Sequence, residues 1–461
     1  MRHSLYAAIV APALFALACG SAAPAIAPPL GQAGADSAVT PTTDAAPTAD
    51  AATNSRQVAG GVWELDSQEL EAPNADLAPL APLLDGAKVV GIGENWHTTG
   101  GQHAMRGRAI RYMVETLGYR TVMLETPWLT ATPLTEYVAK GGDISAAMQS
   151  MFKVFAGTHM QALVEWLRAW NVAHPDDTVE FFGFDVQEAA LIAGSLRGYV
   201  HDKVPAREHE LLAFLPNCYC GTYPSAQACG SSPDAQFGYR KKEFPAARDE
   251  ACHLGQQALE AALQRDAAEF VAASSQRSWQ LAVIAAHNLW AAHRTSASQD
   301  FLAGFLARDE GMKDAVIALS KVRVGGGGTV LMAHNAHVER SSDNTWLRGN
   351  RMPRQQGMGA RLFGALGQKY RVIGQVSWET QINWDGAPQP APNTKANSIE
   401  RALNALEKPY LLVDLRGPSE VVNMAETYSY DAMAGFVTFV PQDTFDALLF
   451  MNTSEAMVTV K

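Results

Sequence analysis

The chain has 461 residues, of which 47% are hydrophobic and 18% are charged. Such a composition is typical of a globular protein, and the length suffices for one large domain or two closely packed ones. The formal net charge of −11 argues against nucleic acid or an anionic membrane surface as the main partner.

Residues 1–24 are predicted to be a signal peptide. They begin with basic residues, continue as an apolar stretch too short for a transmembrane span, and end in small residues. The run ALAC, ending at Cys19, resembles a bacterial lipoprotein signal, in which case a lipid on Cys19 would tether the chain to a membrane. The alternative is cleavage without lipidation near Ala23 or Ala25. Either way, we expect an exported protein of the periplasm or the cell envelope.

Residues 25–60 are predicted to be a disordered linker. They consist mainly of Ala, Pro, Thr, Asp, Ser and Gly, with almost no large apolar side chains. Such a segment cannot bury enough surface to offset the entropy lost on ordering. It would act as a flexible tether in front of one folded domain, residues 61–461.

Five short apolar runs in the folded part predict buried strands, because each is rich in β-branched or aromatic residues and is bounded by glycine or polar residues. Amphipathic helical patterns at 103–118 and 160–174 separate the first of them, and Gly118 would cap the first helix. Strand, helix and strand in close succession predict parallel βαβ units. The runs lie at 88–93, 121–125, 179–185, 329–334 and 370–376.

The fold class is therefore predicted to be α/β, with a mainly parallel central sheet flanked by helices and an associated helical subdomain. The mostly helical region spans about 130–320 and includes 258–294, which is long enough for one or two helices. Candidate strands at 409–416 and 435–440 would add to the sheet near the C-terminal end.

Four cysteines besides Cys19 lie in a single excursion of the helical region, residues 218–252. In an exported protein, an even and clustered set indicates disulfide bonds. Neighbours two residues apart are unlikely to pair on geometric grounds, so Cys218 and Cys220 are expected to pair with Cys229 and Cys252 in some order. A zinc site is the alternative, although the spacing fits no zinc signature.

Acidic and histidine side chains stand at the ends of four predicted strands. A single acid there is usually a helix cap or a solvated loop residue. Several acids at the ends of apolar runs would be costly to desolvate unless they pair with one another, a ligand or a metal. The carboxyl ends of parallel strands meet at one edge, where ligands bind in open α/β sheets. These residues are Glu94, His97, Glu125, Asp185, His334 and His337.

These side chains favour hydrolysis by activated water. The sequence has no GxSxG motif and no cysteine in a catalytic context, so it offers no covalent nucleophile. A histidine backed by a carboxylate can act as a general base and activate water against an ester carbonyl. The same residues could hold a divalent metal ion, which would make the protein a metal-dependent hydrolase. A third alternative is a lipoprotein that binds a small molecule without converting it.

Six motifs in the same order make the chain resemble the erythromycin esterase family. The resemblance covers roughly residues 85–380 and implies an α/β fold with a helical region and hydrolysis of a small-molecule ester or lactone. The motifs are GENWH (93–97), TVMLE (121–125), FFGFD (181–185), ARDEGM (307–312), MAHNAH (332–337) and QGMG (356–359).

The resemblance also implies roles for the candidate catalytic residues. His97 would be the base that activates water, and Glu94 and Glu125 would orient His97 and the attacking water. His334 and His337 would complete the site as oxyanion stabilisers or proton donors.

Substrate contacts are implied for three further residues. Arg106 matches a family arginine that would hold or polarise the substrate. Asp185 matches a motif position where a structural role is equally consistent, as it is for Arg308 and Asp309. Trp96 would shape the rim of the site beside the base.

The loop after the first strand departs from the family pattern Glu-Ala-Thr-His-Gly. Here Trp96 replaces the threonine and Thr98 replaces the last glycine. Together with the cysteine-bearing excursion, these changes leave open whether a macrolide antibiotic is the substrate, and hence whether the protein confers antibiotic resistance.

Overall fold

A computed structural model provides the structure. It describes residues 56–218, 246–298, 300–341, 346–347, 350–351, 356–384, 386–391, 397–432 and 435–460. The predicted signal peptide, Cys19, most of the predicted linker, Cys220 and Cys229 lie outside the described residues.

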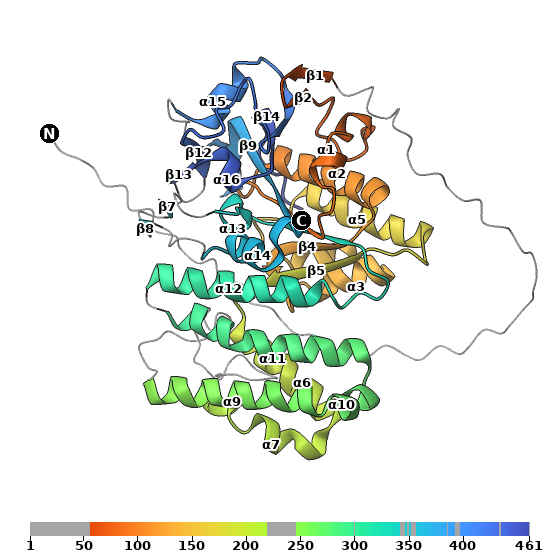
Figure 1. The fold of residues 1–461 in the computed structure, drawn as a ribbon. Coiled ribbons are helices and arrows are strands. Elements are labelled where there is room, and N and C mark those ends of the chain that lie inside the picture. The colour runs from red at the N-terminus through yellow and green to blue at the C-terminus, as the bar shows by residue number, and fades with distance from the viewer. Residues whose placement is uncertain are drawn as a thin grey trace, which may run out of the picture.

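A ten-stranded sheet forms the centre of the structure (Figure 1). The six strands from β14 to β5 are parallel to one another, while β1, β2 and β11 pair antiparallel at one side and β10 pairs antiparallel with β9. This confirms the predicted α/β class with a mainly parallel sheet. The strands in spatial order are β1 (Arg56–Ala59), β2 (Val62–Glu64), β11 (Tyr410–Asp414), β14 (Ala447–Ser454), β9 (Tyr370–Ile382), β3 (Val89–Ile92), β6 (Gly328–Met332), β4 (Tyr119–Pro127) and β5 (Glu180–Asp185), with β10 at Gln389–Pro390.

Two hydrophobic cores lie on opposite faces of this sheet, because successive strand side chains point to opposite sides. Val89 packs in one core and Val90 in the other; Met123 and Val122 divide in the same way. The face of Val90 and Val122 is covered by the early helices. These are η2 (Ala75–Leu77), α1 (Leu80–Leu83), α2 (Gly100–Leu117), α3 (Thr132–Lys140), α4 (Ile144–Gln149) and α5 (Thr158–Ala173).

The opposite face carries α12, α14 and α15 together with a helical lobe, which Figure 1 shows below the sheet. Where 258–294 predicted one or two helices, the structure has the end of α9, then α10 and α11, because Asp266 and Ser275 begin new helices. The lobe and its neighbours are α6 (Ala189–Lys203), η3 (Pro205–Arg207), α7 (Glu208–Leu212), α8 (Leu215–Cys218), α9 (Ala246–Arg265), α10 (Ala267–Ala273), α11 (Gln276–Ala297) and α12 (Phe301–Leu319). The later helices are α13 (Asn335–Val338), α14 (Met358–Leu366), η7 (Gly367–Lys369), α15 (Ile399–Asn404) and α16 (Pro441–Thr444).

Several strands differ from the prediction. Strand β1 begins at Arg56, inside the predicted linker. The predicted strand at 435–440 is β13 (Gly435–Phe439), which pairs with β12 (Tyr428–Ala432) in a separate sheet and not with the central one. Strand β14 was not predicted; its place depends on parallel pairing with the distant β9, which no local pattern reports. A further small sheet joins β7 (Trp346–Leu347) and β8 (Asn350–Arg351).

A disulfide bond joins Cys218 at the end of α8 to Cys252 in α9, with a Cα–Cα distance of 5.4 Å. This is one of the pairings that the cysteine spacing left open. Within the described residues, no helix combines the length and apolarity needed to cross a bilayer.

Candidate functional site

The strand order brings the predicted site residues together. Strand β6 is inserted between β3 and β4, with β5 beyond, so four parallel strands end side by side. Beyond β3 and β6 the two loops are joined directly: the N–H of Glu94 donates to Ala333 O at 3.0 Å, and the N–H of Asn335 donates to Glu94 O at 2.7 Å. Glu94 and the segment of His334 and His337 are thus held against each other.

Glu94 is the centre of the first cluster. Its Oε1 lies 2.5 Å from Nδ1 of His97, and its Oε2 lies 3.0 Å from Nε2 of His103 and 3.1 Å from a guanidinium nitrogen of Arg106. Burial raises the pKa of Glu94, but the charges of Arg106 and His103 outweigh it and hold the pKa well below its usual range. Glu94 is therefore ionised, and Nδ1 of His97 donates to it.

His97 is left with one ring nitrogen for chemistry. Because Nδ1–H donates to Glu94, the lone pair lies on Nε2, which can accept a proton. The His97 ring makes edge-to-face contacts with two rings: that of Phe155, at a centroid distance of 5.1 Å, and that of His334, at 5.5 Å. The residue is 7% exposed. Such a buried, carboxylate-backed imidazole has the geometry of a general base.

Glu125 is the centre of a second cluster. Its Oε1 accepts from Arg308 at 2.6 Å and lies 3.2 Å from Nε2 of His337, and its Oε2 accepts from the N–H of His334 at 2.9 Å. Burial raises the pKa of Glu125, but the charges of His337 and Arg308 outweigh it, so the pKa lies well below its usual range.

His337 lies between two carboxylates in this cluster. Its Nδ1 lies 2.7 Å from Oδ1 of Asp309, and Phe305 stacks on its ring at 4.9 Å. Burial lowers the pKa of His337, but the charges of Glu125 and Asp309 outweigh it and raise the pKa to about 10. Asp309 is fixed in turn because its Oδ2 accepts from the N–H of Met358 at 2.8 Å.

His334 is neutral, although it lies only three residues before His337. Its Nε2 donates to Asn95 O at 3.0 Å, and its Nδ1 accepts from the N–H of Ala336 at 3.1 Å. Burial lowers the pKa of His334 to about 4, and the nearby imidazoles of His97 and His337 add to this because they disfavour a further positive charge. Both ring nitrogens are occupied, so the geometry favours holding the loop at Asn95 over donating a proton.

The two charged residues predicted to bind substrate are fully buried against partners in the protein. Arg106 lies in α2, contacts Oε2 of Glu94 and is 0% exposed. Asp185 accepts from Arg308 at 3.1 and 2.8 Å and from Gln187 at 2.7 Å. These positions indicate that Arg106 stabilises Glu94 and that Asp185 holds Arg308. The predicted contacts of Arg106 and Asp185 with substrate stay predictions.

Trp96 packs against Ile382 and Ala391, next to the β9–β10 hairpin, and is 6% exposed. Thr98, which stands where the family pattern has glycine, has a φ of 60°. Because Thr98 is also only 3% exposed, both departures from the family loop are buried.

Sequence reasoning missed His103, the second imidazole on Glu94. One signal was available: His103 and Arg106 are three residues apart at the start of a predicted helix, so they share a face. Both side chains turn toward Glu94 because of the path of the loop that joins Glu94 to α2. The spacing of His103 and Arg106 does not predict that path.

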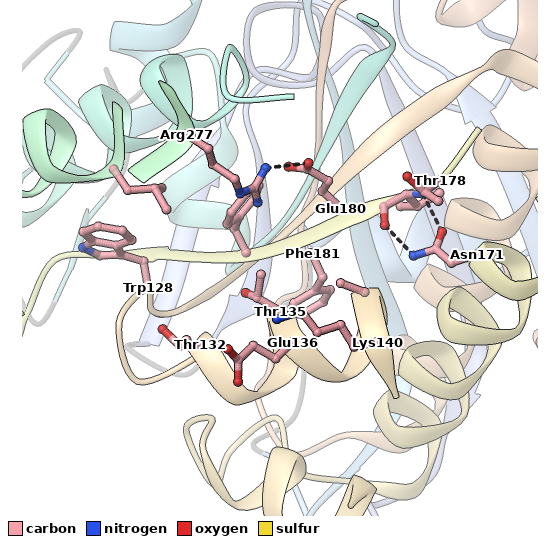
Figure 2. Close-up of a pocket in the computed structure, with 14 residues that line it drawn as sticks. Trp128, Thr132, Thr135, Glu136, Lys140, Asn171, Thr178, Glu180, Phe181 and Arg277 are labelled. Carbon is pink, nitrogen blue, oxygen red and sulfur yellow. Dashed lines mark hydrogen bonds and ion pairs between the residues drawn. The ribbon is translucent and has the colours of Figure 1, made fainter. Parts of the chain in front are cut away.

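A cavity of about 370 Å³ lies elsewhere, beside the edge strand β5 and between α3 and α11 (Figure 2). Trp128, Phe182 and Arg277 help to line it, and Arg277 donates to Glu180 at 2.7 Å. None of the predicted site residues lines this cavity.

The alternative of a divalent metal ion finds no clear set of ligands. Within the described ranges, no group of three or more His, Cys, Asp or Glu side chains is arranged to hold a metal ion. Instead, His97, His103 and His337 are paired with carboxylates in hydrogen-bonding geometry.

Comparisons with known proteins agree with the resemblance in the sequence. The family described as "Erythromycin esterase" matches residues 114–454, which includes Glu125, His334 and His337 but begins after Glu94 and His97. The Escherichia coli protein "Erythromycin esterase type II" is 20% identical over 312 residues, covering 66% of this chain and 72% of that protein.

Solved structures show the same fold. A Bacillus cereus protein superposes with a TM-score of 0.72 at 19% identity, covering 87% of this chain and 97% of its own. A protein described as a succinoglycan biosynthesis protein gives 0.69 at 17% identity, with 87% and 96% covered. A mutant erythromycin esterase in its open conformation gives 0.64 at 16% identity, with 85% and 97% covered.

Proposed function

Because the chain belongs to the erythromycin esterase family, we propose that it is a hydrolase that cleaves an ester or a lactone in a small molecule with water activated by His97. The observation that carries this proposal is the 2.5 Å contact between Nδ1 of His97 and the buried carboxylate of Glu94. A carboxylate in this position selects the tautomer with a free Nε2 and stabilises the imidazolium that forms when Nε2 takes a proton.

In the proposed mechanism, Nε2 of His97 accepts a proton from water while the water oxygen attacks the ester carbonyl carbon. The charge that develops on the carbonyl oxygen is offset by the cations of His337 and Arg308. When the tetrahedral intermediate collapses, His97 returns the proton to the leaving alcohol. No bond to the protein forms, which agrees with the lack of a recognisable nucleophile motif.

Two supporting residues have separate roles in this mechanism. Arg106 stabilises the ionised form of Glu94 from the side opposite His97. His334 is neutral and holds the loop through Asn95 O, so it acts on the site through position and not through proton transfer.

The test is a turnover assay on the purified full chain against a panel of esters and lactones that includes a macrolide. His97→Ala should lower kcat/KM by about 10²- to 10⁴-fold on any accepted substrate. His201→Ala, a change at an exposed histidine of the helical lobe, should leave it unchanged. Full activity of the His97→Ala variant would contradict the proposed mechanism.

The alternative functions give different outcomes in the same experiment. Loss of turnover after dialysis against a chelator, with recovery on adding one divalent cation, would identify a metal-dependent hydrolase. Binding of panel members in calorimetry without turnover would identify a binding protein. Turnover of the macrolide would extend to this chain what the name of the Escherichia coli relative says of that protein.

We also propose that the protein is exported and is tethered through a lipid on Cys19. The support is the leader pattern of residues 1–24 and the bond between Cys218 and Cys252, since disulfides persist in oxidising compartments. Mass analysis of the mature N-terminus tests this: an acylated Cys19 supports it, and a mature chain that starts elsewhere without lipid rejects the tether.

A further inference from the structure

Thr98, the residue that follows His97, has a backbone conformation that its side chain disfavours. Its φ is 60°, in the left-handed region, where a branched β-carbon crowds the neighbouring carbonyl. Among the described residues, Glu407 is the one other non-glycine residue with positive φ, at 54°. A residue keeps such a disfavoured conformation only where the contacts around it compensate for the strain, and such residues concentrate at functional sites.

Two segments far apart in the sequence hold Thr98 in place. Its carbonyl oxygen accepts from the N–H of Asn383 at 3.2 Å and from the N–H of Met457 at 2.9 Å. Its Oγ1 also accepts from the N–H of Asn383 at 3.2 Å. Asn383 and Met457 are themselves joined, because Nδ2 of Asn383 donates to Met457 O at 2.9 Å. Thr98 is 3% exposed and Met457 is 2% exposed, whereas Asn383 is partly buried; we call the contacts of these three residues the clamp.

The left-handed step lets two histidines reach the same carboxylate. After Thr98 the chain returns to an extended residue, Thr99, and enters α2. His97 before the step contacts Oε1 of Glu94, whereas His103 after it contacts Oε2.

We propose that Thr98 is a positioning residue for the reaction: the clamp by Asn383 and Met457 holds the left-handed turn, and the turn holds His97 against Glu94. The inference rests on the proposed hydrolysis only for its kinetic readout. It adds the segment from Glu455 to Val460 and the end of β9 to the elements on which the geometry of the base depends.

Thr98→Gly is the decisive variant. Glycine, the residue of the family pattern here, adopts this φ without strain, but beside Trp96 it leaves this loop without the Oγ1 acceptor for Asn383 and free to move. We expect an unchanged or higher Tm, a kcat lowered by about 10- to 100-fold, and little change in KM, since the base is displaced while the binding surface is kept. Thr98→Asn should restore kcat, because asparagine tolerates the left-handed region and brings a polar acceptor. Glu407→Gly, an exposed site with the same backbone strain, is the matched control and should leave kcat unchanged.

A second readout does not depend on turnover: the NMR signal of the His97 Nδ1–H, which reports its hydrogen bond to Glu94. A shifted or lost signal in Thr98→Gly at equal or higher Tm supports the inference, even if the wild type hydrolyses nothing and the proposed function fails. An unchanged signal and kcat overturn it. A Tm that falls together with kcat, without rescue by Thr98→Asn, also overturns it, because Thr98 would then serve stability alone.

Discussion

Glu94 and Glu125 are buried carboxylates that are stable as anions only because cations surround them. Glu94 has Arg106 beside it, and Glu125 has Arg308 and His337. Removing one partner from such a buried pair typically destabilises the fold by about 3–5 kcal/mol. Replacing both partners by apolar residues of similar volume is often neutral or stabilising. The charges are therefore better explained by chemistry than by stability.

Glu188, at the start of α6, is a carboxyl group with no such cation beside it among the described residues. Its Oε1 accepts a hydrogen bond from Thr130, and burial, together with the charge of Asp185, raises its pKa to about 7. A carboxyl whose folded pKa exceeds its unfolded value stabilises the fold below the unfolded pKa and loses that contribution as pH rises through the folded pKa. The contribution of Glu188 to the free energy of unfolding is therefore lost between pH 4.5 and pH 7.

Glu188→Gln should remove this pH dependence, because the amide keeps an acceptor for Thr130 and carries no charge. We expect the variant to match the wild type near pH 4.5 and to be more stable at pH 8, by up to about 3 kcal/mol. Denaturant unfolding at the two pH values measures the difference. Glu136→Gln, at an exposed position of α3, is the control, and equal gains in both variants would contradict the assignment.

At the scale of elements, the site depends on how α14 meets the turn of α13. The N–H of Met358, the first residue of α14, donates to Asp309 Oδ2, and Asp309 Oδ1 contacts His337. This close approach requires a glycine at the next position: a Cβ on Gly359 would overlap the backbone carbonyl of Val338. The QGMG motif is thus explained by packing next to the site.

Gly359→Ala should push α14 away from α13, destabilise the fold by about 1–3 kcal/mol or more, and lower activity because Asp309 loses its donor. Gly364→Ala on the same helix has nothing within 4 Å of the new methyl group, so it should stabilise slightly through helix propensity and leave activity intact. Thermal unfolding and kcat of both variants test this. A Gly359→Ala protein as stable and active as Gly364→Ala would refute the packing argument.

At the scale of the whole molecule, the site contains residues both from the ends of the sheet strands and from α12, which packs on the helical lobe. Helix α12 packs on α11 of the lobe and on β5 of the sheet, and it supplies Arg308 and Asp309. The bond between Cys218 and Cys252 lies farther out in the lobe, in α8 and α9. The lobe can therefore lose stability at its outer helices while α12 keeps its place.

Replacing both Cys218 and Cys252 by serine should lower the free energy of unfolding by about 2–4 kcal/mol, because the loop between them gains freedom in the unfolded chain. The rate of hydrolysis at 25 °C should remain near that of the wild type. Thermal unfolding and initial rates measure the two effects, and peptide mass mapping confirms the bond in the wild type. Loss of activity in the folded variant would show that α12 depends on the outer lobe.

Local patterns were sufficient for five of the parallel strands, β3, β4, β5, β6 and β9, and for placing acidic and histidine residues at the ends of the first four. The apolar runs before Glu94, Glu125 and Asp185 are short and β-branched or aromatic, and such preferences act over a few residues, so the sequence alone reveals them. The same holds for the cap at Gly118, which has a φ of 73°. The α/β class followed from the alternation of these elements.

Partners, protonation states and strand order lie beyond such patterns, because they depend on contacts between residues far apart in the chain. Strand β6 comes to lie between β3 and β4 after the whole helical lobe has intervened, and that insertion places His337 beside Glu125. His334 and His337 look equivalent in HNAH, yet burial lowers the pKa of the first, whereas the charges of two carboxylates raise the pKa of the second. Burial and neighbouring charge set these states, and both arise only once the chain has folded.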